Sequence, residues 1–131
     1  MIGLREASNM SRTPILSMAL IVFGLLGGSP VQAVEVEQLF KFYCVQCHGL
    51  EGKGDGPNVG KEFPVDPRNF TKADEMEKLS DADIKNVILD GGPSASKSAM
   101  MPPWGKTLTD EEVDALVKYL RKLCNCTGKA S

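Results

Sequence analysis

The five residues Cys44-Val45-Gln46-Cys47-His48 constrain this chain more than any other stretch. Two thiols spaced three residues apart lie on one side of a helical turn, where they can reach two vinyl groups on one edge of a porphyrin. The next residue, His48, continues the turn and can place an imidazole nitrogen on the porphyrin iron. This pattern is typical of covalent haem c attachment, and we expect one haem c at Cys44, Cys47 and His48.

Two other interpretations of this motif are weaker. A thioredoxin-like redox pair would need a βαβ context, which the sequence does not predict. A zinc site would need a second pair of ligands at a matching spacing. The remaining cysteines, Cys124 and Cys126, are separated by a single residue, and His48 is the only histidine in the chain.

The chain begins with the pattern of a secretory signal peptide over residues 1–33. Arg5 and Arg12 give a basic start, residues 15–27 form an apolar run, and residues 31–33 form a small-residue cleavage site. The apolar run is shorter than the about 20 residues that a membrane span needs. We therefore predict cleavage and export to the periplasm or another extracytoplasmic compartment, with an uncleaved membrane anchor as the alternative.

The remaining residues, 34–131, suffice for one domain, for which we predict an all-α fold. Apolar residues at helical spacing predict a first helix over residues 34–43. Capping boxes at Ser80 and Thr109 predict the starts of a middle and a last helix. The glycine-rich stretch 49–60 predicts a loop. The formal net charge of −2 gives no support for nucleic-acid binding, which calls for a basic face.

The second axial ligand of the iron must come from a residue other than histidine. Because His48 is the only histidine, the chain cannot supply two-histidine ligation or a distal acid–base histidine. Of the six methionines, the three in residues 1–33 leave with the predicted signal peptide. Met76 lies in a polar segment that favours a packing role, which leaves Met100 and Met101. A residue before proline is held in extended geometry, and Pro102 stiffens the loop that presents the sulfur. We therefore favour Met101, with Met100 as the alternative and an open position as a further one.

The chain resembles the class I c-type cytochromes, which are small monohaem electron carriers. The resemblance rests on features that occur here in the family's order: the first helix, Cys-x-x-Cys-His, the glycine–proline loop, the Met-Pro loop and the last helix. The resemblance covers residues 34–131. It implies that N-terminal, middle and C-terminal helices pack around one covalently bound haem. It also implies thioethers at Cys44 and Cys47, His48 as the proximal ligand and Met101 as the distal ligand.

The same resemblance implies supporting roles for residues around the haem. The carbonyl of Pro57 is expected to accept a hydrogen bond from the second nitrogen of the proximal imidazole. Phe40 on the first helix is expected to pack across Leu116 and Tyr119 on the last. Trp104 is expected near the haem, with an ordinary aromatic core position as the alternative.

With both axial positions filled by side chains, the iron has no open site for a substrate and can only change oxidation state. We therefore predict no enzymatic activity, and one-electron transfer between larger redox proteins of a respiratory or similar chain. One alternative is a haem c subunit, membrane-tethered or tightly bound, of an oxidase or dehydrogenase complex. A peroxidase is disfavoured because a second histidine is missing, and a gas sensor would require that Met101 does not bind the iron.

Cys124 and Cys126 lie outside this pattern. They can bridge each other through a tight ring, pair with another chain, bind a soft metal such as copper, or stay free. Free thiols are unusual outside the cytoplasm. We expect a monomer, with a dimer through Cys124 or Cys126 as the alternative.

Overall fold

The computed structural model describes residues 31–60 and 63–130. Its helices come in the order α1 (Val31–Tyr43), α2 (Val45–His48), α3 (Ala73–Met76), α4 (Asp81–Asp90), the 3-10 helix η1 (Gly92–Ala95) and α5 (Asp110–Cys124). The described residues form no strand, so the prediction of an all-α fold is confirmed. Within these residues, no helix has both the length and the apolar character that a membrane crossing requires.

The predicted signal peptide lies outside the described residues, apart from residues 31–33 at the start of α1. The apolar spacing predicted that the first helix begins at Val34, whereas in the structure it begins at Val31.

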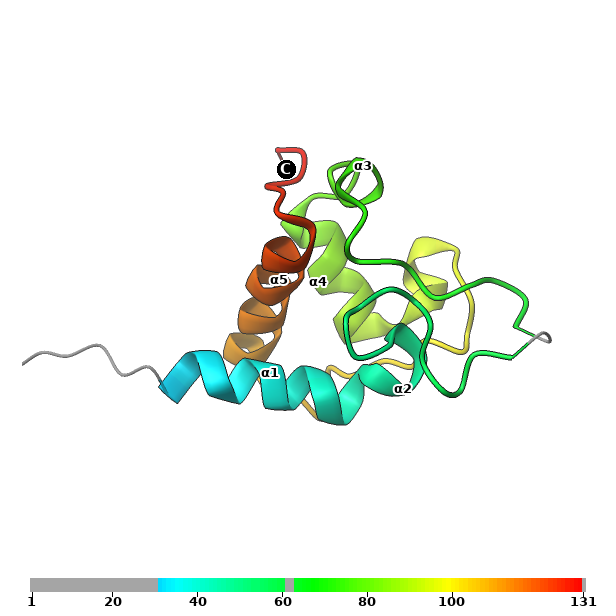
Figure 1. The fold of residues 1–131 in the computed structure, drawn as a ribbon, viewed down its shortest axis with the longest axis horizontal. Coiled ribbons are helices and arrows are strands. Elements are labelled where there is room, and N and C mark those ends of the chain that lie inside the picture. The colour runs from blue at the N-terminus through cyan, green and yellow to red at the C-terminus, as the bar shows by residue number, and fades with distance from the viewer. Residues whose placement is uncertain (1–30, 61–62, 131) are drawn as a thin grey trace, which may run out of the picture.

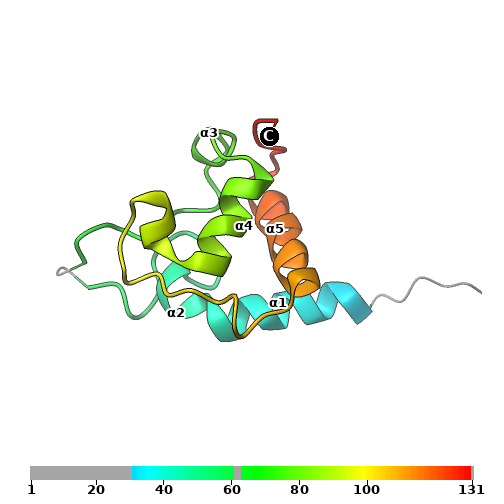
Figure 2. The same cartoon turned by 180° about the vertical axis from the view of Figure 1, so that it is seen from behind.

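The frame of the molecule consists of α1, α4 and α5. Figure 1 shows α5 rising from α1 with α4 beside it, and Figure 2 shows the same arrangement from behind. Helix α5 contacts both α1 and α4. The predicted N-terminal, middle and C-terminal helices are thus all present and packed together. The loop after α2 extends beyond α4, on the side away from α5 (Figures 1 and 2).

The packing of α1 on α5 depends on Phe40. Its side chain is 1% exposed, and its ring centroid lies 5.2 Å from that of Tyr119. Leu116 belongs to the same buried core. Full burial of a phenylalanine contributes about 1.5–3 kcal/mol relative to exposure. The predicted packing of the first helix against the last through these three residues is confirmed.

Both longer helices of the C-terminal half begin at a reciprocal capping box, as predicted. The Ser80 hydroxyl accepts from the Asp83 N–H at 3.1 Å, and the Asp83 carboxylate accepts from the Ser80 N–H at 2.8 Å. Thr109 and Glu112 form the same pair of bonds at the start of α5. Such caps are worth about 0.5–2 kcal/mol each, so these local sequence signals fix where both helices start.

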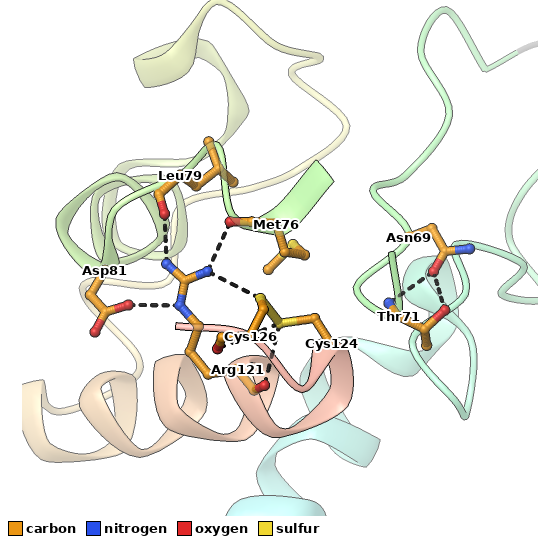
Figure 3. Close-up of a disulfide and its surroundings, with 8 residues drawn as sticks. All are labelled: Asn69, Thr71, Met76, Leu79, Asp81, Arg121, Cys124 and Cys126. Atoms are coloured by element: carbon orange, nitrogen blue, oxygen red, sulfur yellow. Dashed lines mark hydrogen bonds and ion pairs between the residues drawn. A yellow bond between two sulfur atoms is a disulfide. The ribbon is translucent and has the colours of Figure 1, made fainter. Parts of the chain in front are cut away.

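The C-terminal end of α5 carries a disulfide between Cys124 and Cys126 (Figure 3). The intervening Asn125 adopts the left-handed conformation, with φ of 50°, and this ends the helix. Both cysteines are buried. Of the alternatives that the sequence left open, the structure shows pairing within the chain, which leaves neither sulfur available for a second chain or a metal.

Candidate haem-binding site

A cavity of about 850 Å³ lies between α2, α4 and the segments that follow α2 and η1. Ligand cavities in proteins usually measure about 300–1,000 Å³, so this one has room for a cofactor. Its wall is mainly apolar. Most of the residues predicted from the sequence to bind or contact the cofactor border it, namely Cys44, Cys47, His48, Met100, Met101 and Trp104.

Helix α2 is a single turn that the glycine-rich loop after it holds in place. The N–H of Gly54 donates to the carbonyl of His48 at 2.8 Å, and the N–H of Gly56 donates to the carbonyl of Cys47 at 3.1 Å. These carbonyls would otherwise be unpaired at the end of the helix. A Cβ on Gly56 would overlap the backbone of α2, so only glycine allows the loop to approach this closely.

The imidazole of His48 is buried and hydrogen-bonded through its Nδ1 atom. Nδ1 lies 3.1 Å from the carbonyl oxygen of Arg68. A carbonyl oxygen only accepts, so Nδ1 carries the proton and donates it. Nε2 then keeps its lone pair, which is what a metal ion requires of a neutral imidazole.

The acceptor for Nδ1 differs from the expectation for Pro57. Pro57 is exposed and does not border the cavity. The carbonyl of Arg68 is the acceptor instead, because the chain folds back beside the loop that follows α2. There the N–H of Phe70 donates to the carbonyl of Gly52 at 2.7 Å. The expected kind of bond is therefore present, and the expected partner is wrong.

The ring of Phe70 stacks on the imidazole of His48. The ring centroids are 4.3 Å apart and the planes are inclined by 22°. Phe70 also meets Phe40 edge-on, at 6.2 Å between centroids. His48 is thus held by a hydrogen bond at one nitrogen and by an aromatic face, and such support fixes the orientation of a metal-binding imidazole.

The pKa values of the motif residues and the side chains around them bear on the two alternative interpretations, a redox pair and a zinc site. Burial, together with the neighbouring Cys47, raises the pKa of the Cys44 thiol to about 12. A thioredoxin-like redox cysteine needs a lowered pKa, so this raised pKa gives the redox-pair interpretation no support. In the described part of the chain, no three His, Cys, Asp or Glu side chains are grouped to hold a metal ion, so the zinc interpretation has no support. Burial lowers the pKa of His48, whose imidazole is therefore neutral at pH 7.

Met100 and Met101 both border the cavity, but their surroundings differ. The N–H of Met101 donates to the carbonyl of Ser98 at 3.2 Å, and its carbonyl accepts from the N–H of Gly92 at 2.9 Å. Met100 is 55% exposed. The backbone of Met101 is thus held on both sides, whereas Met100 faces largely outwards.

Trp104 connects the Met101 segment to α1 and α4. Its backbone N–H donates to the carbonyl of Ile88 at 2.9 Å. Its ring meets that of Tyr43 edge-on, at 5.1 Å between centroids. Because Trp104 and Tyr43 both border the cavity, this pair forms part of the cavity wall as well as part of the packing.

Residues 31–120 match the family described as cytochrome C oxidase, cbb3-type, subunit III. The chain is a c-type cytochrome of this family. It is similar to two proteins named cytochrome c-553. The protein from Nitratidesulfovibrio vulgaris (strain DSM 19637 / Miyazaki F) is 32% identical over 105 residues, which are 80% of this chain and 89% of that protein. The protein from Helicobacter pylori (strain ATCC 700392 / 26695) is 25% identical over 109 residues, which are 83% and 95% of the two chains.

Two solved structures resemble this cytochrome in fold. The KustC0563 c-type cytochrome aligns with a TM-score of 0.52 and 34% identity, over 66% of this chain and 94% of its own. A chain of the Kuenenia stuttgartiensis reducing HAO-like protein complex Kustc0457/Kustc0458 aligns with a TM-score of 0.54 and 33% identity. This alignment covers 68% of the present chain and 41% of that chain. The fold is therefore that of a cytochrome c, and the cofactor is a covalently bound haem c.

The cavity residues of this cytochrome fit that cofactor. Two thiols, an imidazole with a free Nε2 and thioether sulfurs border a mainly apolar space. Sequence reasoning missed Arg68 because its contribution comes from a backbone carbonyl, which no side-chain pattern reveals. Met76, which the sequence assigned to packing, is fully buried and borders the cavity.

Proposed function

We propose that this cytochrome is an exported single-haem electron carrier that shuttles single electrons between larger redox proteins. One observation carries the proposal. A single mainly apolar cavity is bordered by the thiols of Cys44 and Cys47, by His48 with a free Nε2, and by Met101 on a fixed backbone. These are the groups needed to bind a haem covalently and to fill both axial positions of its iron.

The roles of these residues follow from their chemistry. Cys44 and Cys47 would each add across a vinyl group, with the sulfur bonding to one carbon and the thiol hydrogen going to the other. Nε2 of His48 and the sulfur of Met101 would take the two axial positions. The haem supplies a one-electron iron couple. Methionine ligation and an apolar wall both raise the reduction potential of such a couple.

With His48 and Met101 in both axial positions, the iron would have no free coordination site for a substrate. A small substrate or gas would have to displace the Met101 sulfur. The backbone bonds of Met101 to Ser98 and Gly92 oppose that displacement, because they restrict how far the residue can move. The cytochrome would therefore exchange electrons with protein partners instead of converting a bound substrate.

The carrier is exported, and its mature chain comprises residues 34–131. Residues 1–33 carry the basic start, the apolar run and the cleavage site of a signal peptide. The compartment is the periplasm or another space outside the cytoplasm. The mature protein is a monomer, which is supported by the pairing of Cys124 with Cys126 inside the chain.

A second candidate function is that of a haem c subunit fixed in a larger complex. It is favoured by the description of the matching family, which names an oxidase subunit, and by a structural neighbour that belongs to a protein complex. Cell fractionation and intact-mass analysis distinguish the two functions. The carrier is expected in the soluble exported fraction, starting at Val34 and holding one haem. A chain that keeps residues 1–33 and co-purifies with larger subunits from the membrane fraction would overturn the proposal in favour of the subunit.

A further inference from the structure

Arg121 on α5 is a largely buried cation that the proposed haem chemistry does not use. Its side chain is 10% exposed. As Figure 3 shows, its Nε donates to the carboxylate of Asp81 at 2.8 Å, while its Nη1 and Nη2 donate to the carbonyls of Met76 and Leu79 at 2.8 and 2.7 Å. One guanidinium thus joins the last helix to both ends of the connection between α3 and α4.

That connection forms part of the wall of the haem cavity. Met76 and Leu79 both border the cavity, and Met76 is fully buried. The carbonyl of Met76 lies at the end of α3, where helix carbonyls lack partners within the helix. Because bonds from a charged donor are about twice as strong as neutral ones, Arg121 is a major constraint on the position of this wall.

The disulfide closes the C-terminal segment over Arg121. Sγ of Cys126 lies 3.7 Å from Nη1 of Arg121, and the N–H of Cys126 donates to the Arg121 carbonyl at 3.2 Å. Further along, Gly128 lies so close that a Cβ there would overlap both the guanidinium and the carbonyl of Leu79. The segment held by the Cys124–Cys126 disulfide therefore covers the guanidinium on the side of its part-buried bonds to the carbonyls of Met76 and Leu79, and hydrogen bonds less exposed to water are electrostatically stronger.

We propose that Arg121 is a positioning residue for the Met76–Leu79 wall of the haem cavity, and that the Cys124–Cys126 disulfide is a thiol-sensitive latch that keeps Arg121 in place. Reduction by a dithiol consumes two electrons and two protons. It breaks the S–S bond, leaves two thiols on the cytochrome and converts the dithiol to its own disulfide. The segment from Cys126 onwards is then released, water reaches the guanidinium, and the wall loosens around the haem.

This inference rests on the haem occupying the cavity, as proposed above. The test uses the full exported holoprotein, kept in the ferrous state by ascorbate so that the dithiol does not change the iron. Free thiols are counted before and after treatment with dithiothreitol. Amide hydrogen exchange of residues 73–81 and the circular dichroism of the haem Soret band report on the wall. The variants are Arg121→Gln, the double variant Cys124→Ser/Cys126→Ser, and Lys122→Gln as a matched control at an exposed neighbour on α5.

In the wild type we expect two new thiols, a rise of about tenfold in exchange over residues 73–81, comparable with losing one charge-assisted hydrogen bond, and a changed Soret signal. The double variant should show the same state without the dithiol and no further response to it. Arg121→Gln should show faster exchange and an altered Soret signal, while Lys122→Gln should match the wild type.

Three results would overturn the inference: two free thiols before treatment, unchanged exchange and Soret signals after two thiols have appeared, or wild-type behaviour of Arg121→Gln. The haem content of the purified protein keeps this test separate from the proposed function. A chain without covalent haem would contradict the proposed function, whereas a full haem complement with no response to the dithiol would overturn only the latch.

Discussion

Nδ1 of His48 lies 3.1 Å from the carbonyl oxygen of Arg68, a residue 20 positions further along the chain. This bond selects the tautomer that leaves Nε2 free for a metal. The orientation of the proposed proximal ligand therefore depends on a loop that must close before the bond can form. Substitutions in that loop should affect the haem site even where they touch neither His48 nor the cysteines.

Gly56→Ala tests how closely the loop must approach α2. A Cβ at this position would overlap the backbone of α2, and overpacking of this kind costs about 1–3 kcal/mol. We expect a lower free energy of unfolding by urea and a smaller yield of protein with attached haem. The matched control is Gly60→Ala, because a Cβ there would meet nothing within 4 Å. Equal stability and haem yield in the two variants would show that the close approach is unimportant.

Phe70→Ala removes the ring that stacks on His48. The side chain is 9% exposed, and truncating a buried phenylalanine typically costs about 3–5 kcal/mol. We expect a loss of that order in the free energy of unfolding, with a shift in the reduction potential because the imidazole is held less firmly. Phe42→Ala serves as the control, since Phe42 is 77% exposed, and should stay within about 0.5 kcal/mol of the wild type. A reduction potential that does not change in Phe70→Ala would argue against the supporting role of the ring.

The capping box of α4 predicts part of the acid sensitivity. Hydrogen bonds from Ser80 lower the pKa of Asp83 below its ordinary value of 3.8, and Lys129 adds to the shift. A carboxylate with a lowered pKa in the folded state stabilises the protein above its ordinary pKa, and this stability is lost as the pH falls through the folded-state value. Thermal unfolding from pH 7 down to pH 2 should therefore show a midpoint that declines below about pH 4.

Asp83→Asn should lower the unfolding midpoint at pH 7 and flatten its decline in acid. Asp90→Asn is the matched control at the other end of α4, where a negative charge opposes the helix dipole, and it should not lower the midpoint at pH 7. An Asp83→Asn variant with the full acid decline of the wild type would show that the cap does not contribute to it.

The parts of the structure that local sequence signals encode were predictable. Ser80 and Thr109 mark the starts of their helices because each bonds to a residue three positions away. Phe40 meets Tyr119 as the family resemblance implied. Such features depend on a few neighbouring residues or on a pattern shared by related chains.

Contacts made by the backbone over long distances in the chain were not predictable. The carbonyl of Arg68 replaces that of Pro57 because the course of the loop, and not any side chain, decides which carbonyl reaches His48. A basic residue near a helix end, such as Arg121, is expected to interact with the helix dipole. Nothing in the sequence indicates that its guanidinium turns towards the carbonyls of Met76 and Leu79, which lie more than 40 positions earlier.

Absorption spectra of the oxidised and reduced protein show whether the sulfur of Met101 is the distal ligand of the haem iron. The spectra would compare the wild type with Met101→Ala and Met100→Ala, with and without carbon monoxide. We predict that the wild type is low-spin when ferric, shows the weak long-wavelength band of sulfur-ligated haem, and binds carbon monoxide slowly when ferrous. Met101→Ala should lose that band and bind carbon monoxide promptly, while Met100→Ala should match the wild type. A high-spin ferric wild type that binds carbon monoxide promptly once reduced, or loss of the band in Met100→Ala but not in Met101→Ala, would show that Met101 is not the distal ligand.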